Sequence, residues 1–359
     1  MTLMNKRDAF LFTICFLVSF FVVGCNSSDA AKKKKPAAVP AVAKDSVERN
    51  KQVQAAAPVP PPPPPTLDTA LYNKYQLHLA HDSASPKWPV KGEYPLPGAL
   101  LPFNRIIAYY GNFYSVHMGI LGELPPDEML KKLMGEVKKW QAADTTIHVI
   151  PAIHYIAVTA QGQPGKGGKY ILRMPFAQID KAIELAKKID AVVFLDVQVG
   201  QSTLQKEIPM LEQYLAMPNV HLAIDPEFSM KTGRRPGSII GTFDAADINY
   251  VSKYLADLVK KNNLPPKILV VHRFTLGMVT NYEDIDLRRE VQMVMDMDGW
   301  GFPAKKVNSY KLTVGTKPVQ FTGFKLFYKN DIKTPPWKTI MTPAEVLKLY
   351  PSPIYIQYQ

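Results

Sequence analysis

The stretch Ala191-Val-Val-Phe-Leu-Asp196-Val-Gln198 is a short β-rich run that ends in polar side chains. A helical pattern over residues 176–188 precedes it, and another over residues 204–216 follows it. Short strands that alternate with amphipathic helices are typical of βαβ units and of a parallel sheet. The stretch therefore predicts a fold of the α/β class.

The same alternation repeats from Arg105 onward. Eight strands with helices between them, over about 290 residues, predict a single (β/α)8 barrel of the TIM type. The alternative is an open doubly wound sheet, which needs a phosphate-binding glycine loop after its first strand. Neither Tyr110-Gly111-Asn112 nor the glycine-rich residues 165–168 form such a loop. The expected strands are 105–110, 147–153, 191–196, 220–225, 267–271, 291–296, 323–328 and 353–359, and the expected helices are 126–142, 176–188, 204–216, 245–261, 282–289, 304–310 and one that starts at Thr342.

The first 24 residues have the pattern of an export signal. A basic start is followed by an apolar run over residues 10–23, which is shorter than the roughly 20 residues that span a bilayer. The segment Val22-Val23-Gly24-Cys25 resembles the lipobox of bacterial lipoproteins. That resemblance implies a lipid on Cys25, a membrane anchor and a location in the cell envelope. Asn26 after the cysteine favours the outer membrane in a double-membraned cell.

Residues 25–66 are rich in Ala, Lys and Pro and include six consecutive prolines. Such a segment cannot bury a core, so we expect a disordered tether. The expected organisation is a signal over 1–24, a lipidated tether over 25–66 and a barrel domain over 67–359. The sequence has 2 cysteines, one in the signal and one at the lipid site, so no disulfide is expected.

Charge and motif content narrow the class of partner. The formal net charge is +12, but the signal and tether hold part of it, and no basic stripe marks a nucleic-acid surface. No zinc spacing of the H-E-x-x-H kind is present. We expect a monomer that binds no nucleic acid, no cofactor and no metal.

Polar residues collect at the predicted carboxyl ends of the strands, where barrel enzymes carry their sites. Residues two apart share one face of a strand, so the alternation predicts which side chains point toward the barrel axis. At least five carboxylates would converge there, and each buried unpaired charge costs several kcal/mol. For Asp298, helix capping or turn formation is as good an interpretation as function. For His154 and His272, each taken singly, a structural role is the better interpretation. The carboxylates are Asp196, Asp225, Glu227, Asp296 and Asp298, and the other expected site residues are Tyr110, His154, Gln198, His272, Lys325, Tyr355 and Gln357.

Asp225 and Glu227 are the strongest candidates for chemistry. If they alternate on one strand end, their Cα atoms are about 7 Å apart. Like charges at that distance push the two pKa values apart, so one group can stay protonated at neutral pH. That is the requirement for a general acid at a glycosidic oxygen.

The segment Leu222-Ala-Ile-Asp225-Pro-Glu227-Phe228 resembles the Asp-x-Glu strand end of chitinase-type and lysozyme-type barrel glycosidases. The resemblance implies that Glu227 is the acid/base and that Asp225 assists, with Asp196 or Asp296 as a second carboxylate. The sequence departs from the chitinase pattern at His221 and Ala223. It departs from the larger retaining clan at Lys325, where that clan has a glutamate at the end of the seventh strand.

Several segments of the barrel, including Phe194-Leu-Asp196-Val-Gln198, also resemble a group of bacterial barrel lipoproteins to which no activity is attached. The preferred hypothesis is a surface-tethered glycoside hydrolase acting on an envelope or environmental polysaccharide. Two alternatives stay open: a non-catalytic carbohydrate-binding or scaffold lipoprotein, and a metal-dependent hydrolase. The residues expected to bind substrate are Tyr110, His154, Gln198, His272, Asp298, Lys325, Tyr355 and Gln357.

Overall fold

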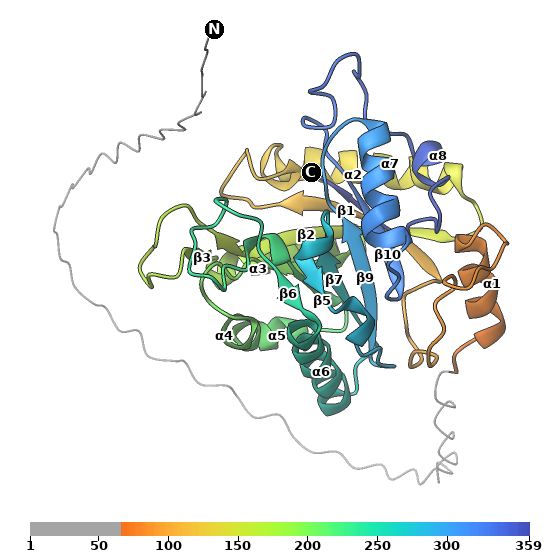
Figure 1. The fold of residues 1–359 in the computed structure, drawn as a ribbon, viewed down its shortest axis with the longest axis horizontal. Coiled ribbons are helices and arrows are strands. Elements are labelled where there is room, and N and C mark those ends of the chain that lie inside the picture. The colour runs from red at the N-terminus through yellow and green to blue at the C-terminus, as the bar shows by residue number, and fades with distance from the viewer. Residues whose placement is uncertain (1–65) are drawn as a thin grey trace, which may run out of the picture. The chain divides into compact units, whose positions relative to one another are not determined.

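A computed structural model describes residues 66–359, which form a closed barrel of parallel strands (Figure 1). Each barrel strand pairs in parallel with its neighbours, and β1 pairs with both β2 and β11, which closes the ring. The predicted (β/α)8 barrel is confirmed, and the open sheet is excluded. Around the barrel the strands are β1 (Asn104–Gly111), β2 (His148–Ala160), β4 (Val192–Val197), β5 (Val220–Ile224), β7 (Lys267–His272), β9 (Val291–Met297), β10 (Phe321–Leu326) and β11 (Tyr355–Tyr358).

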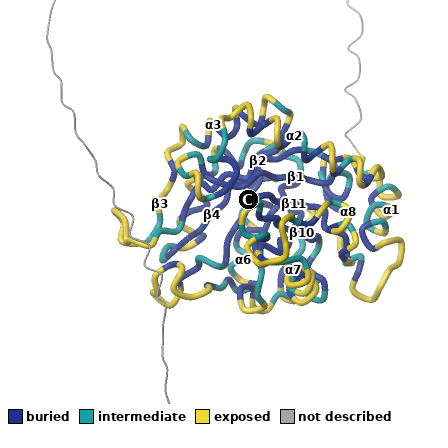
Figure 2. The backbone as a smooth tube through the Cα atoms, turned by 90° about the horizontal axis from the view of Figure 1, so that it is seen from above, coloured by how far each residue is buried: buried dark blue, intermediate teal, exposed yellow. Residues whose placement is uncertain are grey.

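Side chains alternate between the two faces of the barrel wall, as predicted. Met293, Met295 and Met297 of β9 belong to the apolar layer that also contains the buried helix residues. Val294 belongs instead to the cluster inside the barrel, with Phe194 of β4. Figure 2 shows the strands buried at the centre and the exposed positions on the surrounding helices and loops. The aspartates that alternate with the methionines therefore face the barrel axis.

Helices cover the outside of the barrel and begin where the sequence predicts. α2 starts at Pro126 with two acidic residues in its first turn, and α6 starts with a capping box at Asp244 and Asp247. A second capping box, at Thr342 and Glu345, starts α8. The helices are α2 (Pro126–Ala143), α3 (Phe176–Lys187), α4 (Leu204–Glu207), α5 (Glu212–Leu215), α6 (Ala245–Asn262), α7 (Pro303–Tyr310) and α8 (Pro343–Val346).

Two predicted helices differ in the structure. The one over 204–216 is broken into α4, a 3-10 turn and α5, because Pro209 lacks the N–H that a continuous helix needs. The one over 282–289 is wrong beyond the 3-10 turn Tyr282–Asp284. There the side chain of Asn249 on α6 bonds the carbonyl of Asp284 and the N–H of Asp286, which fixes an irregular path.

The amino end of the barrel is filled. The sequence did not predict α1 (Thr69–Leu79), whose Tyr72 and Leu79 join Leu101 in the cluster inside the barrel. Gln292 of β9 bonds both the N–H and the carbonyl of Leu101, at 3.0 and 2.5 Å. The opposite end of the barrel, at the carboxyl ends of the strands, is therefore where a cavity has room to form.

Small elements extend the wall at this open end. The carboxyl-terminal part of β2 pairs with the antiparallel strand β3 (Ile171–Arg173), and β6 (Phe243–Asp244) pairs with β8 (Val279–Thr280). The predicted signal, Cys25 and the predicted tether up to residue 65 lie outside the described residues. Within residues 66–359, no helix is long and apolar enough to cross a membrane.

Candidate active site

A cavity of about 660 Å³ opens at the carboxyl ends of the strands. Each barrel strand, or the segment that follows it, contributes to the wall. Carboxyl groups, amines and aromatic rings share it, which is the composition expected of a binding site for a polar ligand. The polar lining residues include Tyr110, Thr159, Gln198, Asp225, Glu227, Asp298, Lys305 and Lys325, and the aromatic ones include Phe228, Phe274, Trp300 and Phe327.

Asp225 and Glu227 lie in a tight turn after β5 rather than on the strand. β5 ends at Ile224, and Pro226–Phe228 forms one turn of 3-10 helix. The Asp225 Oδ1 atom caps this turn by accepting the N–H of Glu227 at 3.0 Å. Proline suits the first position of a helical turn, where no N–H is required. The prediction that the pair alternates on a strand is therefore wrong, although both residues line the cavity.

The carboxyl group of Glu227 keeps a proton near neutral pH. Burial and the neighbouring charge of Asp298 raise the pKa of Glu227 from 4.5 to about 7, against the opposing effect of Lys325 and His272. Burial also raises the pKa of Asp225 well above its ordinary value, although His272 opposes the shift. The cavity thus holds one carboxyl group with a pKa of about 7 and a second whose pKa is also raised by burial.

Asp298 is the third carboxyl group in the wall, and two cations lie near it. Burial raises the pKa of Asp298, whereas His272 and Lys325 favour its ionised form. The Lys325 Nζ atom lies 3.7 Å from the ring centre of Tyr110. The Tyr110 hydroxyl in turn accepts a hydrogen bond from Gln198 Nε2 at 3.2 Å. These contacts fix the floor of the cavity.

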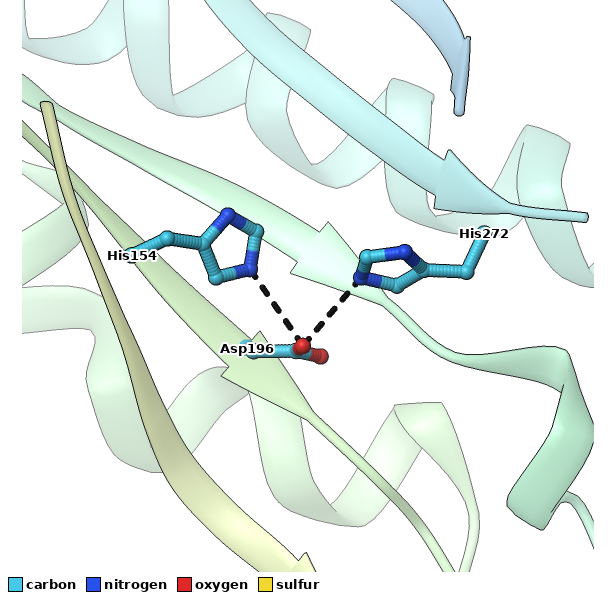
Figure 3. Close-up of side chains that lie close together, drawn as sticks. All are labelled: His154, Asp196 and His272. Carbon is cyan, nitrogen blue, oxygen red and sulfur yellow. Dashed lines mark hydrogen bonds and ion pairs between the residues drawn. The ribbon is translucent and has the colours of Figure 1, made fainter. Parts of the chain in front are cut away.

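Below this floor, a fully buried cluster joins three strands: His154 of β2, Asp196 of β4 and His272 of β7 (Figure 3). Both imidazole rings point their Nε2 atoms at one carboxylate oxygen. The distances to Asp196 Oδ2 are 3.3 Å from His154 and 3.2 Å from His272. Burial tends to raise the pKa of Asp196, but the two rings outweigh it and hold that pKa well below its ordinary value.

His154 is held from its other side by two residues of β11. Its Nδ1 atom lies 2.5 Å from the hydroxyl of Tyr355 and 3.0 Å from Gln357 Nε2. Burial lowers the pKa of His154 from 6.5 to about 4, although Asp196 opposes the shift. His154 is therefore neutral at physiological pH, and the predicted Tyr355 and Gln357 serve to orient it rather than to line the cavity.

His272 connects Asp196 to two further aspartates. Its Nδ1 atom lies 3.3 Å from Asp296 Oδ2 and 3.5 Å from Asp298 Oδ2. Burial alone would lower the pKa of His272, but Asp196, Asp296 and Asp298 raise it well above its ordinary value. The three aspartates thus favour the charged form of His272, which lies between the buried cluster and the cavity wall.

Several buried oxygens of this region have no hydrogen-bond partner among the described residues. They are Oδ1 of Asp196, both carboxylate oxygens of Asp296 and Oδ1 of Asp298. An unpaired buried carboxylate is costly, and such atoms commonly mark a site for a ligand, an ion or water.

The structure separates the predicted site residues into two layers. The cavity wall holds Tyr110, Gln198, Asp225, Glu227, Asp298 and Lys325, and the buried layer beneath it holds His154, Asp196, His272, Asp296, Tyr355 and Gln357. Asp196 and Asp296 therefore contact no space that a substrate could fill.

The sequence did not reveal Lys306, which is almost fully buried beside the carboxyl ends of β9 and β10. Its Nζ atom bonds the carbonyls of Gly299 and Lys325, at 2.9 and 2.7 Å, and forms an ion pair with Asp331 at 3.0 Å. This amine joins the segment after β9 to strand β10 and to the segment after it. No local sequence pattern identifies Lys306, because a lysine in a short helix is usually exposed.

No protein-family model matches the chain, and no curated protein matches its sequence. Among solved structures it is similar to a cellulase, Cel5C_n, at 14% identity and a TM-score of 0.38, over 66% of this chain and 69% of that chain. It is also similar to a hyperthermophilic endo-β-1,4-glucanase in complex with substrate, at 11% identity and a TM-score of 0.34, over 62% and 81% of the two chains.

Proposed function

We propose that this protein is a glycoside hydrolase whose general acid is Glu227. The observation that carries the proposal is the pKa of Glu227, raised to about 7 in the wall of a cavity that also holds Asp225 and Asp298. A carboxyl group protonated near neutral pH can deliver its proton to a glycosidic oxygen as the bond breaks.

The two neighbouring carboxyl groups take different parts in this mechanism. Asp225 caps the turn that carries Glu227, so it positions the acid through the backbone. Asp298 is the other cavity carboxyl group; burial raises its pKa, and His272 and Lys325 oppose that shift. We assign Asp298 to stabilising the positive charge that develops on the sugar ring, or to activating the attacking group. Asp296 and Asp196, the partners expected from the sequence, are buried below the cavity.

Aromatic side chains support a sugar substrate. Phe228, Phe274, Trp300 and Phe327 line the cavity beside the carboxyl groups. Flat apolar rings next to hydrogen-bonding groups match the apolar faces and hydroxyl edges of a pyranose. We propose a polysaccharide of the cell envelope or the environment as the substrate. Attachment through lipidated Cys25 belongs to the same proposal, because it would place the barrel at a membrane surface.

The test is release of reducing ends from a panel of polysaccharides and peptidoglycan by the purified chain. We expect hydrolysis of at least one glycan by the wild type and loss of that activity in Glu227→Gln. The matched control is Glu184→Gln, which changes an exposed glutamate on α3, away from the cavity. Equal activity in all three proteins would contradict the assignment of Glu227.

Lys325 favours a second candidate, a non-catalytic carbohydrate-binding protein. It places an amine, rather than another carboxyl group, near the end of β10 in the cavity wall. Binding of a glycan that no preparation hydrolyses, with equal affinity in the wild type and Glu227→Gln, would establish this candidate and remove the first.

A further inference from the structure

The cluster of His154, Asp196 and His272 combines the residue types and the spacing of a metal site. Two imidazole nitrogens and one carboxylate oxygen from three different strands converge within 4.8 Å of one another. We infer that these residues form a closed binding site for a divalent zinc-type ion beneath the active-site floor. This inference does not depend on the proposed hydrolase activity.

The two distances from the carboxylate to the histidines match the edges of a tetrahedral site. Zinc bonds of 2.0–2.1 Å at tetrahedral angles place neighbouring ligand atoms roughly 3.3 Å apart. The Asp196 Oδ2 atom lies 3.3 Å from Nε2 of His154 and 3.2 Å from Nε2 of His272. In Figure 3 both rings point at the carboxylate from opposite sides. A small shift of the side chains would place all three atoms at bonding distance from one ion.

Both histidines have an outer partner of the kind that orients metal ligands. Nδ1 of His272 lies 3.3 Å from Asp296 Oδ2 and 3.5 Å from Asp298 Oδ2, close enough for a small rotation to form a hydrogen bond that is absent among the described residues. Nδ1 of His154 faces Tyr355 and Gln357. Oε1 of Gln357 has no partner, and half a turn of that amide would place a carbonyl oxygen beside Nδ1. Each ring could then donate its Nδ1 proton outward and keep a lone pair on Nε2.

The unpaired oxygens of the neighbouring carboxylates also favour an ion. Oδ1 of Asp196 and both carboxylate oxygens of Asp296 are buried and have no hydrogen-bond partner among the described residues. A divalent ion supplies positive charge beside these carboxylates.

The surroundings favour a four-coordinate ion over an octahedral one. The three residues are fully buried, and the ring of Phe194 stacks on His154 at 5.5 Å. The ring of Tyr110 lies 5.2 Å from that of His154 and separates the cluster from the cavity. The three protein atoms leave one position of a four-coordinate ion, which a single water molecule can fill. Because Tyr110 lies between the cluster and the cavity, the ion would contact no substrate there, and we assign it to stabilising the barrel.

The experiment is to express the chain in zinc-supplemented medium, purify it, dialyse it and measure zinc by mass spectrometry. We expect one ion per chain in the wild type and near-complete loss in His154→Asn and His272→Asn. Asparagine places a polar atom where Nδ1 was and deletes Nε2. The matched control is His221→Asn, another buried barrel histidine outside the cluster, and it should keep the ion.

A second measurement covers the case in which the histidine variants fail to fold. Wild-type chain expressed with cobalt in place of zinc should show the intense visible absorption of tetrahedral Co(II). Wild-type chain without bound metal, or zinc retained equally by both folded variants, would overturn the site. The variant Glu227→Gln should keep its zinc ion. The metal-site proposal and the general-acid proposal can therefore be contradicted independently.

Discussion

Replacing Glu227 by glutamine tests the raised pKa through stability as well as activity. In the folded chain the pKa of Glu227 is about 7, against 4.5 for the ordinary group. The folded state therefore holds its proton more tightly than the unfolded state. The contribution of Glu227 to the free energy of unfolding is therefore largest below about pH 4.5 and is lost as pH rises from there through about 7.

The size of this effect follows from the shift. A difference between 4.5 and about 7 corresponds to roughly 3 kcal/mol, at about 1.4 kcal/mol per pKa unit. Glutamine cannot ionise, so Glu227→Gln should match the wild type at pH 4 and exceed its stability by up to that amount at pH 8. For a domain of this size the difference is a rise of roughly 5–10 °C in melting temperature. Glycan hydrolysis should fall by about 10²–10⁴-fold.

The assay is thermal unfolding of the wild type, Glu227→Gln and the surface control Glu184→Gln at pH 4, 6 and 8. A stability gain that appears only in Glu227→Gln and grows with pH is the expected result. A loss of stability in Glu227→Gln that is equal at all three pH values would contradict a raised pKa for Glu227. It would show that the Glu227 carboxylate is bound to a donor that glutamine cannot replace.

Three further changes test the fold and the attachment. Gly323→Ala would place its Cβ 2.6 Å from Asp296 Oδ1 and 3.0 Å from Tyr355, so we expect a loss of about 1–3 kcal/mol by urea unfolding, and an unchanged midpoint would contradict this packing. Deleting residues 353–359 removes β11 and leaves β1 and β10 as open edges, so the chain should not fold, and a cooperative, monomeric product would contradict barrel closure. Cys25→Ser should abolish lipid labelling and membrane fractionation, and unchanged labelling would contradict the lipobox assignment.

Local patterns predicted most of the barrel. The alternation in β9 placed Met293 and Met295 outside and Asp296 inside, because burial on both faces still leaves a two-residue period. The start of α2 at Pro126 could also be predicted from the residues at that position. Contacts between distant segments could not be predicted: the path of residues 282–289 depends on Asn249 of α6.

The candidate site was predictable as a set of residues but not as a geometry. The rule that polar residues at strand ends converge collected the right carboxyl groups and histidines at one end of the barrel. Which of them reach the cavity depends on how deep in the barrel each side chain lies. Tyr110 lines the cavity, whereas Asp196 lies beneath it and is fully buried. The pairing of His154 and His272 on one aspartate joins residues 42 and 76 positions away in sequence, beyond any local signal.

The pH dependence of kcat/KM for glycan hydrolysis by the wild-type chain tests whether Glu227 is the general acid. If Glu227 is the general acid, the rate should fall as pH rises through about 7, because the acid loses its proton there. The residual rate of Glu227→Gln should lack that descending limb. A glycan hydrolysed by both proteins with the same pH profile, or by neither at any pH, would contradict the account.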